Sequence, residues 1–105
     1  MMKLPAIDID LLIQIEPDTV VSYLDSQGWA KTEEKFQPQR TIWKYSLDNS
    51  RDAFVMLPMD KTIPDFSYRI YDLIRVLAIV EKRSEFDLYD SFCSTQKANG
   101  FAGIR

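Results

Sequence analysis

Apolar and polar residues in positions 62–83 alternate with the period of an α-helix. Thr62 and Asp65 have the spacing of a capping box, and Pro64 suits a first helical turn, where its missing N–H costs nothing. The pattern therefore predicts one long helix against which the rest of the chain packs. Its inner apolar stripe consists of Phe66, Ile70, Leu73, Ile74, Leu77 and Val80.

A second, smaller set of apolar residues lies on the outer side of this predicted helix. Tyr68, Val76 and Ile79 project away from the inner stripe. A helix that covers a sheet with one face is usually more polar on the other. We therefore expect another element of the chain, or a partner, to contact these three residues.

Residues 6–16 show the two-residue alternation of a β-strand. The odd-numbered positions from Ile7 to Ile15 are apolar, and most even-numbered positions are polar. A helical reading, in which Leu11, Leu12 and Ile15 share a face, stays open. We favour an N-terminal strand.

A short helix is predicted over about 17–27. Pro17 and Asp18 suit its first turn, because proline tolerates that position and a carboxylate favours the positive end of the helix dipole. Gly28 is a natural stop signal, and Trp29 is placed to pack back on the last turn.

Three further segments have strand patterns. Residues 31–36 show a weak pattern, and residues 40–47 a clear one. After a turn at 48–51, residues 53–59 return with apolar side chains on both faces, which is typical of a central or covered strand. Pro58 must lie near an end or a bulge of that strand, because it has no N–H.

The C-terminal part contains one more helix signal. Ser84 and Asp87 have capping-box spacing and open a short helix over 84–94. This helix is the internal candidate for covering the outer residues of the long helix. Its expected apolar side consists of Phe86, Tyr89, Phe92 and Cys93.

These elements predict an α+β fold. A three-stranded antiparallel sheet is packed on one face by a short N-terminal helix and a long helix. We expect a single domain and a flexible C-terminal tail. The boundaries are about 17–27 and 62–83 for the helices, 6–16 for the extra N-terminal strand, 84–94 for the C-terminal helix, 1–95 for the domain and 96–105 for the tail.

Composition narrows the range of functions. The chain has 105 residues, of which 46% are hydrophobic, enough for one packed core. Its formal charge of −3 gives no bulk attraction to nucleic acid or to an anionic membrane. Asp8 and Asp10 interrupt any signal-peptide core, and the apolar run Val76–Val80 is too short to span a bilayer. We expect a soluble cytoplasmic protein without membrane contact.

The residue types present exclude several kinds of chemistry. The chain has no histidine, so histidine-based catalysis and histidine metal sites are excluded. Cys93 is the single cysteine, and we interpret it as a small apolar residue. The three glycines form no phosphate-binding loop. We expect no catalytic residue, metal site or cofactor.

One hypothesis, considered beside an interaction module and an RNA-binding protein, is a carboxylate-based metal enzyme. Pro17-Asp18 followed by Glu33-Glu34-Lys35 has the spacing of a PD-(D/E)xK nuclease motif. That chemistry needs the acidic residues and the lysine on neighbouring strands around magnesium. Because Asp18 here suits a helix start, solvated surface charge is the better interpretation.

An RNA-binding reading depends on the predicted strands. Arg40 and Lys44 lie beside Trp43, and an open sheet face with such residues could stack bases and contact phosphates. Acidic residues, among them Asp48 and Asp52, interrupt the same region and nearly cancel its charge. RNA binding is therefore the alternative and not the leading hypothesis.

The order of elements resembles the small HicA-type mRNA interferase toxins, which have a double-stranded-RNA-binding-like α-β-β-β-α fold. The resemblance covers about residues 18–82 and consists of the helix ending in Gly28-Trp29 and the strand closing at Pro58. At the place of the family's Gly-Ser-His motif this chain has Pro38-Gln39-Arg40. Without that histidine, the resemblance implies the fold but no ribonuclease activity.

The leading hypothesis is a small non-catalytic interaction module of a soluble, bacterial-type protein. Two apolar surfaces are left over, one on the last strand and one on the long helix, and such patches tend to mark interfaces. They suit a protein partner or a second copy of the chain. The alternatives are a plain monomer, in which the terminal segments cover both surfaces, and an RNA-binding or degenerate interferase-like protein. The candidate interface residues are Phe54, Met56, Tyr68, Val76 and Ile79.

Overall fold

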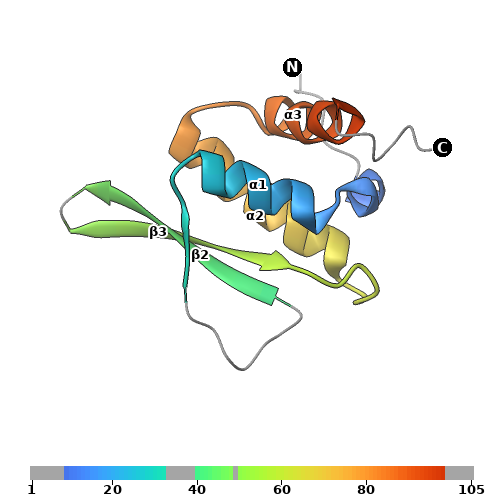
Figure 1. Ribbon diagram of the computed structural model, residues 1–105, viewed down its shortest axis with the longest axis horizontal. Helices are drawn as coiled ribbons and strands as arrows, with labels where there is room; N and C mark the ends of the chain where they lie inside the picture. The colour runs from blue at the N-terminus through green and yellow to red at the C-terminus, as the bar shows by residue number, and fades with distance from the viewer. Residues whose placement is uncertain (1–8, 33–39, 49, 99–105) are drawn as a thin grey trace, which may run out of the picture.

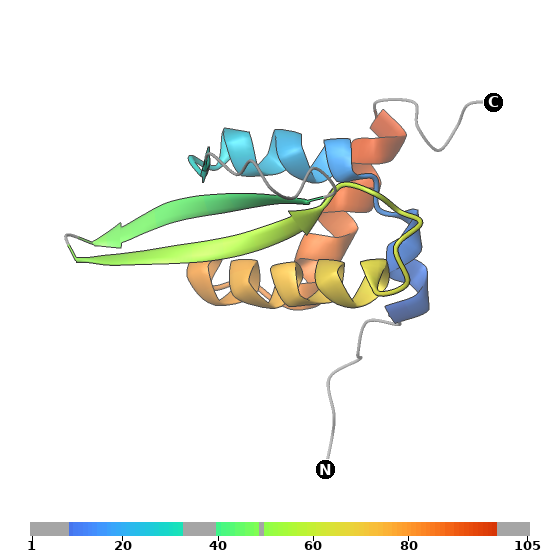
Figure 2. The same cartoon turned by 90° about the horizontal axis from the view of Figure 1, so that it is seen from below.

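The computed structural model describes residues 9–32, 40–48 and 50–98, and confirms the predicted α+β class. The sheet is antiparallel with strand order β1-β2-β3. The helices lie on one side of the β2–β3 hairpin (Figure 1), and α3 crosses α1 and α2 (Figure 2). The elements are the 3-10 helix η1 (Ile9–Gln14), α1 (Pro17–Ser26), β1 (Ala30–Lys31), β2 (Arg40–Asp48), β3 (Arg51–Pro58), α2 (Phe66–Glu81) and α3 (Glu85–Ala98).

The end of α1 follows the predicted glycine-aromatic signal. Gly28 has a φ of 94°, a conformation that glycine adopts without the Cβ penalty. Its N–H donates to the carbonyl of Asp25 at 3.2 Å, and the N–H of Trp29 donates to the carbonyl of Leu24 at 3.0 Å. These two bonds form a Schellman motif, and Trp29 is buried in the core beside the ring of Tyr45.

The backbone at Gly28 gives a first prediction. We expect Gly28→Ala to lower the free energy of unfolding by about 1–2 kcal/mol, because an L-residue is strained at this φ. A Cβ would meet Tyr45 Cε1 at 3.6 Å, an ordinary contact, so the cost lies in the backbone. Urea denaturation measures it, with Gln27→Ala as the control at the neighbouring, exposed position. Equal losses for both variants would contradict the argument.

The long helix begins later than predicted, at Phe66 instead of Thr62. Asp60 accepts hydrogen bonds from the N–H of Thr62 at 2.9 Å and from its hydroxyl at 2.6 Å. This side-chain turn competes with helix initiation, so Thr62 belongs to the turn and caps nothing. The helix ends at Lys82, which has a left-handed φ of 58°.

The inner stripe of α2 is confirmed, and it packs on the inner face of the sheet. On β2 and β3, that inner face is formed by Trp43, Val55 and Leu57, which are buried. Val80 is only half-buried, because it lies in the last turn of the helix. The buried members of the stripe are Phe66, Ile70, Leu73, Ile74 and Leu77.

The predicted N-terminal strand over 6–16 is wrong in its described part, which contains η1 and ends at Glu16, the N-cap of α1. Leu12 and Ile15 are buried, whereas Leu11 and Ile13 are exposed. A strand would bury alternate residues, but a 3-10 helix repeats every three and places Leu12 and Ile15 on one face. The helical alternative was nearer to the structure. The first three residues of the predicted strand lie outside the described part.

The sheet differs from the prediction at two places. β1 contains only Ala30–Lys31, and most of the predicted strand 31–36 lies outside the described residues. In the hairpin, the pairing shifts register between Ser46 and Asp48. Leu47 lies within this irregularity and is exposed, although the alternation predicts it on the buried face.

Helix α3 is capped as predicted, with Ser84 Oγ accepting the N–H of Asp87 at 3.0 Å. Its buried side was predicted only in part. Phe92 is buried as expected, but Phe86 is exposed and Leu88 takes the other core position. Leu88 and Phe92 are four residues apart and share one face of the helix, which Phe86 does not.

Helix α3 runs to Ala98, beyond its predicted end, so the predicted tail over 96–105 begins inside the helix. Gln96 is buried and joins distant parts of the chain. Its carbonyl oxygen accepts the N–H of Glu16 at 2.7 Å, and its amide donates to the carbonyl of Gln14 at 3.1 Å. These bonds satisfy backbone groups at the start of α1. The remainder of the predicted tail lies outside the described residues.

Candidate interaction site

A groove of about 190 Å³ lies between β3 and α2. Small-molecule sites have volumes of roughly 300–1,000 Å³, so this groove suits individual side chains better than an enclosed cofactor. Three of the five predicted interface residues, Phe54, Met56 and Val76, line it. Its other lining residues, Val55, Arg69, Asp72 and Leu73, are not among the predicted interface residues.

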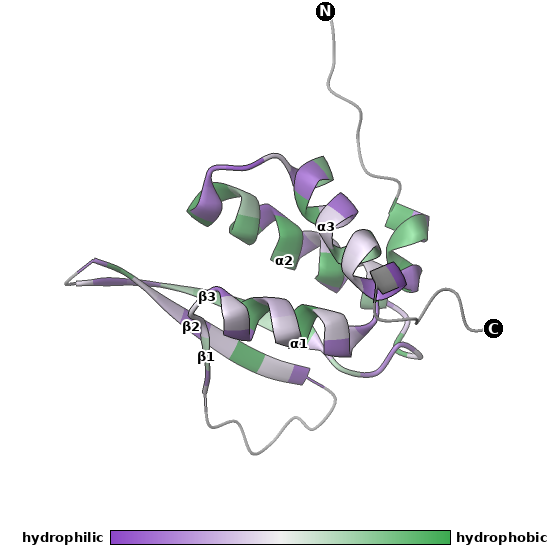
Figure 3. Ribbon diagram, turned by 45° about the horizontal axis from the view of Figure 1, so that its top comes forward, coloured by the Kyte–Doolittle hydropathy of each residue, from purple (hydrophilic) through white to green (hydrophobic). Residues whose placement is uncertain are grey.

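The predicted interface residues keep contact with solvent. Phe54, Tyr68 and Ile79 are 56%, 62% and 75% exposed, whereas Met56 and Val76 are half-buried. Helix α3 packs against α1 and α2 through Leu88 and Phe92, and leaves Tyr68 and Ile79 uncovered. Figure 3 shows hydrophobic residues along α2, whereas the tip of the β2–β3 hairpin is hydrophilic. The C-terminal helix therefore does not cover the outer side of α2.

Two of the three charged side chains on this part of α2 are engaged within the helix. The guanidinium of Arg69 pairs with Asp65 at 2.9 Å. Arg75 is directed toward the ring of Tyr71, with its guanidinium carbon 6.0 Å from the ring centroid. Among the described residues, Asp72 forms no ion pair, although it lies three residues before Arg75. The groove therefore contains one carboxylate that is not neutralised by a direct partner.

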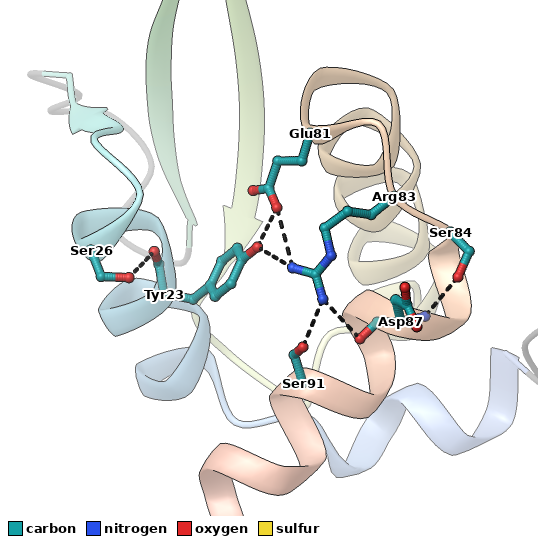
Figure 4. A network of polar contacts seen from close by, with 7 residues as sticks. All are labelled: Tyr23, Ser26, Glu81, Arg83, Ser84, Asp87 and Ser91. Atoms are coloured by element: carbon teal, nitrogen blue, oxygen red, sulfur yellow. Dashed lines mark hydrogen bonds and ion pairs between the residues drawn. The ribbon is translucent and has the colours of Figure 1, made fainter.

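A polar network joins the three α-helices at a second place (Figure 4). The hydroxyl of Tyr23 donates to the carboxylate of Glu81. Arg83 Nη1 donates to the Tyr23 hydroxyl at 3.0 Å and lies 3.4 Å from Glu81 Oε1. Arg83 Nη2 donates to Ser91 Oγ at 2.9 Å. The network links α1, the end of α2 and α3.

Burial raises the pKa of the Tyr23 phenol, and the hydrogen bond to Glu81 raises it further. The phenol is therefore a stable donor at neutral pH, and its partner Glu81 is an acceptor. This arrangement holds the helix junction together and shares no residue with the groove. No sequence pattern indicated it, because its members come from three separate segments.

Of the residues of the RNA-binding alternative, Arg40 and Lys44 lie on one face of β2 and Trp43 lies on the other. Trp43 is buried in the core, and its indole N–H donates to Thr41 Oγ1 at 2.9 Å. Lys44 is exposed on the opposite face of β2. Arg40 is half-buried, with Nη1 3.5 Å from the sulfur of Met56. Trp43 cannot stack on a base while it occupies the core.

No group of three histidine, cysteine, aspartate or glutamate side chains in the described residues is placed to hold a metal ion. Asp18 lies in the first turn of α1, and Glu33-Glu34-Lys35 lies outside the described part. Within residues 9–32, 40–48 and 50–98, no helix is long and apolar enough to cross a membrane.

The fold and the groove together define an α+β protein with an exposed apolar site beside an edge strand. Comparisons of the chain with family models, curated proteins and solved structures found no match. The resemblance to HicA-type toxins therefore remains a prediction from the sequence, and the function is argued from the groove itself.

Proposed function

We propose that this chain is a non-catalytic protein-interaction module that binds its partner through the β3–α2 groove and the adjoining outer side of α2. The observation that carries the proposal is that Phe54, which lines the groove, and Tyr68 and Ile79 of α2 are exposed. Burial of apolar surface is a favourable contribution to most protein associations. Large apolar side chains in an exposed cluster with aromatic members are typical of protein interfaces.

The chemistry of the groove favours a protein over a nucleic acid. The carboxylate of Asp72 lines it, and the positive charge of Arg69 is balanced by Asp65. Phosphate contact requires unbalanced cations, which the formal charge of −3 does not favour either. Arg40 and Lys44 have no stacking residue beside them in Trp43, because its ring is in the core.

Site-specific photo-crosslinking tests the proposal. We replace Phe54 or Tyr68 by the photoreactive residue benzoylphenylalanine in the full chain, and irradiate cells of the source organism. Phe86 is the matched control, because it is a phenylalanine with the same 56% exposure as Phe54 and lies on α3. We expect a discrete protein adduct from Phe54 and Tyr68 and none from Phe86.

The adduct is then verified with the purified partner. We expect Phe54→Ala or Tyr68→Ala to weaken its binding by at least about tenfold, since buried aromatic residues dominate interfaces, and Phe86→Ala to leave it unchanged. The proposal is wrong if Phe54 and Tyr68 give no adduct, or if all three positions give the same adducts.

A further inference from the structure

The groove runs beside an edge of the sheet that is free among residues 9–32, 40–48 and 50–98. β3 is the last strand in the order β1-β2-β3, so β2 pairs with only one of its two edges. Such an edge presents backbone N–H and C=O groups that can pair with another extended chain. The hydrogen bonds of β2 and its register with β3 identify which residues present them.

The N–H and C=O of one strand residue point to the same side, and this side alternates along the strand. The carbonyl of Ile42 accepts the N–H of Thr32 at 2.8 Å, so the polar groups of Ile42 face β1 and not β3. Met56 is opposite Ile42 and forms a non-hydrogen-bonded pair with it. The N–H and C=O of Met56 therefore face the free edge, and by alternation so do those of Phe54.

Pro58 agrees with this assignment. It lies two residues after Met56 and four after Phe54, so its nitrogen also faces away from β2. Proline lacks an N–H, and it is tolerated where no ladder bond is required. The free edge thus has donors at Phe54 and Met56. Among the described residues, neither amide donates in the turn, loop and cap hydrogen bonds.

The same two residues border the groove, with their side chains on the face of the sheet opposite to that of Val55. Phe54 and Met56 line it together with Val76 of α2. An unpaired strand edge beside an apolar groove can bind an extended peptide, because the backbone bonds hold the peptide and the groove takes its alternate side chains. A helical partner would leave the amides of the edge without acceptors.

The charged residues near the groove indicate which side chains a segment bound at the β3 edge should carry. Asp72 lines the groove without an ion pair among the described residues. Asp52 is exposed two residues before Phe54, about 7 Å along the strand. Arg69 is balanced by Asp65, and Lys44 on β2 does not line the groove. Asp52 shares the outer face of β3 with Phe54, whereas Asp72 lies on the helix side, so a lysine or arginine directed toward α2 is complementary to Asp72.

A second copy of the chain fits less well. Symmetric antiparallel pairing of two β3 strands about Val55 would bring the α2 helix of each copy, with its Asp72, to the same face of the seam. Like charges placed together oppose association. A different chain with lysine or arginine meets no such repulsion.

We infer that the β3 edge binds an extended segment of a partner protein as a fourth strand. In this segment apolar residues alternate with lysine or arginine. The apolar side chains lie on the outer face of the sheet and contact Phe54 and Met56, and the cations lie on the helix side and face Asp72. This inference rests on the proposed function and specifies the partner's chemistry and its mode of binding.

Peptide selection tests the inference. A phage-displayed library of random twelve-residue peptides is selected on the full chain, and enriched peptides are synthesised. We expect alternating apolar and basic residues in them. In NMR-detected hydrogen exchange, a saturating peptide should slow the amides of Phe54 and Met56 by at least about tenfold, because both become hydrogen-bonded. The amide of Val55, which already faces β2, should change little.

Two modifications distinguish strand pairing from other contacts. The amides of an extended peptide form two alternating sets, and only one set faces β3. N-methylation of that set should weaken binding at least about tenfold, and N-methylation of the other set should have little effect. Asp72→Lys should weaken binding by a similar factor. Asp90→Lys makes the same charge change at an exposed position of α3 and should have little effect.

Each other outcome overturns the inference. It fails if no peptide is enriched, or if N-methylation of the two alternating sets of amides has the same effect. It also fails if light scattering shows a dimer that pairs through β3. Peptides that protect only residues of α2, such as Tyr68, would overturn strand addition and leave the interaction module intact. The proposed function fails separately, through the absence of crosslinked adducts at Phe54 and Tyr68.

Discussion

Phe92→Ala is expected to lower the free energy of unfolding by about 3–5 kcal/mol, the usual cost of removing a fully buried aromatic ring. Phe92 has no solvent exposure, and its ring lies edge-on to that of Tyr23, with 5.2 Å between the centroids. The substitution removes this ring contact and leaves a cavity where α3 meets α1. Small domains have unfolding free energies of about 5–15 kcal/mol, so the loss is a large part of the total.

Phe86→Ala is the matched control, because it makes the same chemical change in the same helix at an exposed position. We expect its effect to stay within about 0.5 kcal/mol. Urea denaturation of both variants, followed by circular dichroism and tryptophan fluorescence, measures the difference. Equal losses for Phe92→Ala and Phe86→Ala would show that α3 does not pack as described.

The parts of the fold that the sequence predicted well depend on local signals. The inner stripe of α2 follows from a three- and four-residue repeat sustained over several turns. The end of α1 follows from Gly28-Trp29, because a positive φ and a returning aromatic side chain need no distant contact. The cap at Ser84 is local in the same way.

The features of the fold that the sequence predicted wrongly, or did not predict, depend on contacts between distant segments. The N-terminal residues alternate like a strand, but a short apolar segment fits either period, and packing of η1 on α2 decides for Leu12 and Ile15. Gln96 bonds to Glu16 and Gln14 across 80 and 82 positions of the chain. A polar residue near the end of a chain gives no local sign of such a role.

The candidate site was predictable only on its helical side. The period of α2 alone places Tyr68 and Ile79 away from the core. β3 is apolar on both faces, so its pattern cannot decide whether Phe54 or Val55 faces outward, and the register with β2 does decide it. The role of Asp72 required the observed position of Arg75 over Tyr71.

Tyr23→Phe is expected to lower the free energy of unfolding at pH 7 by about 1–3 kcal/mol, because Glu81 loses a donor in a partly buried place. Among the described residues, the second carboxylate oxygen of Glu81 is already buried without a partner. Arg83 remains beside Glu81 and limits the loss. Tyr68→Phe is the control, since that hydroxyl belongs to an exposed residue.

The same substitution should change how stability depends on alkaline pH. Folding raises the pKa of Tyr23 above its ordinary value of 10.0, so above pH 10 the unfolded chain releases this proton before the folded chain does. The contribution of Tyr23 is therefore complete below pH 10 and declines at higher pH, by up to about 1.4 kcal/mol per pH unit. The difference between wild type and Tyr23→Phe should shrink accordingly from pH 9.5 to 11.5 in urea denaturation, since the other titrating groups are common to both. A constant difference over that range would mean that the phenol does not keep its proton in the helix junction.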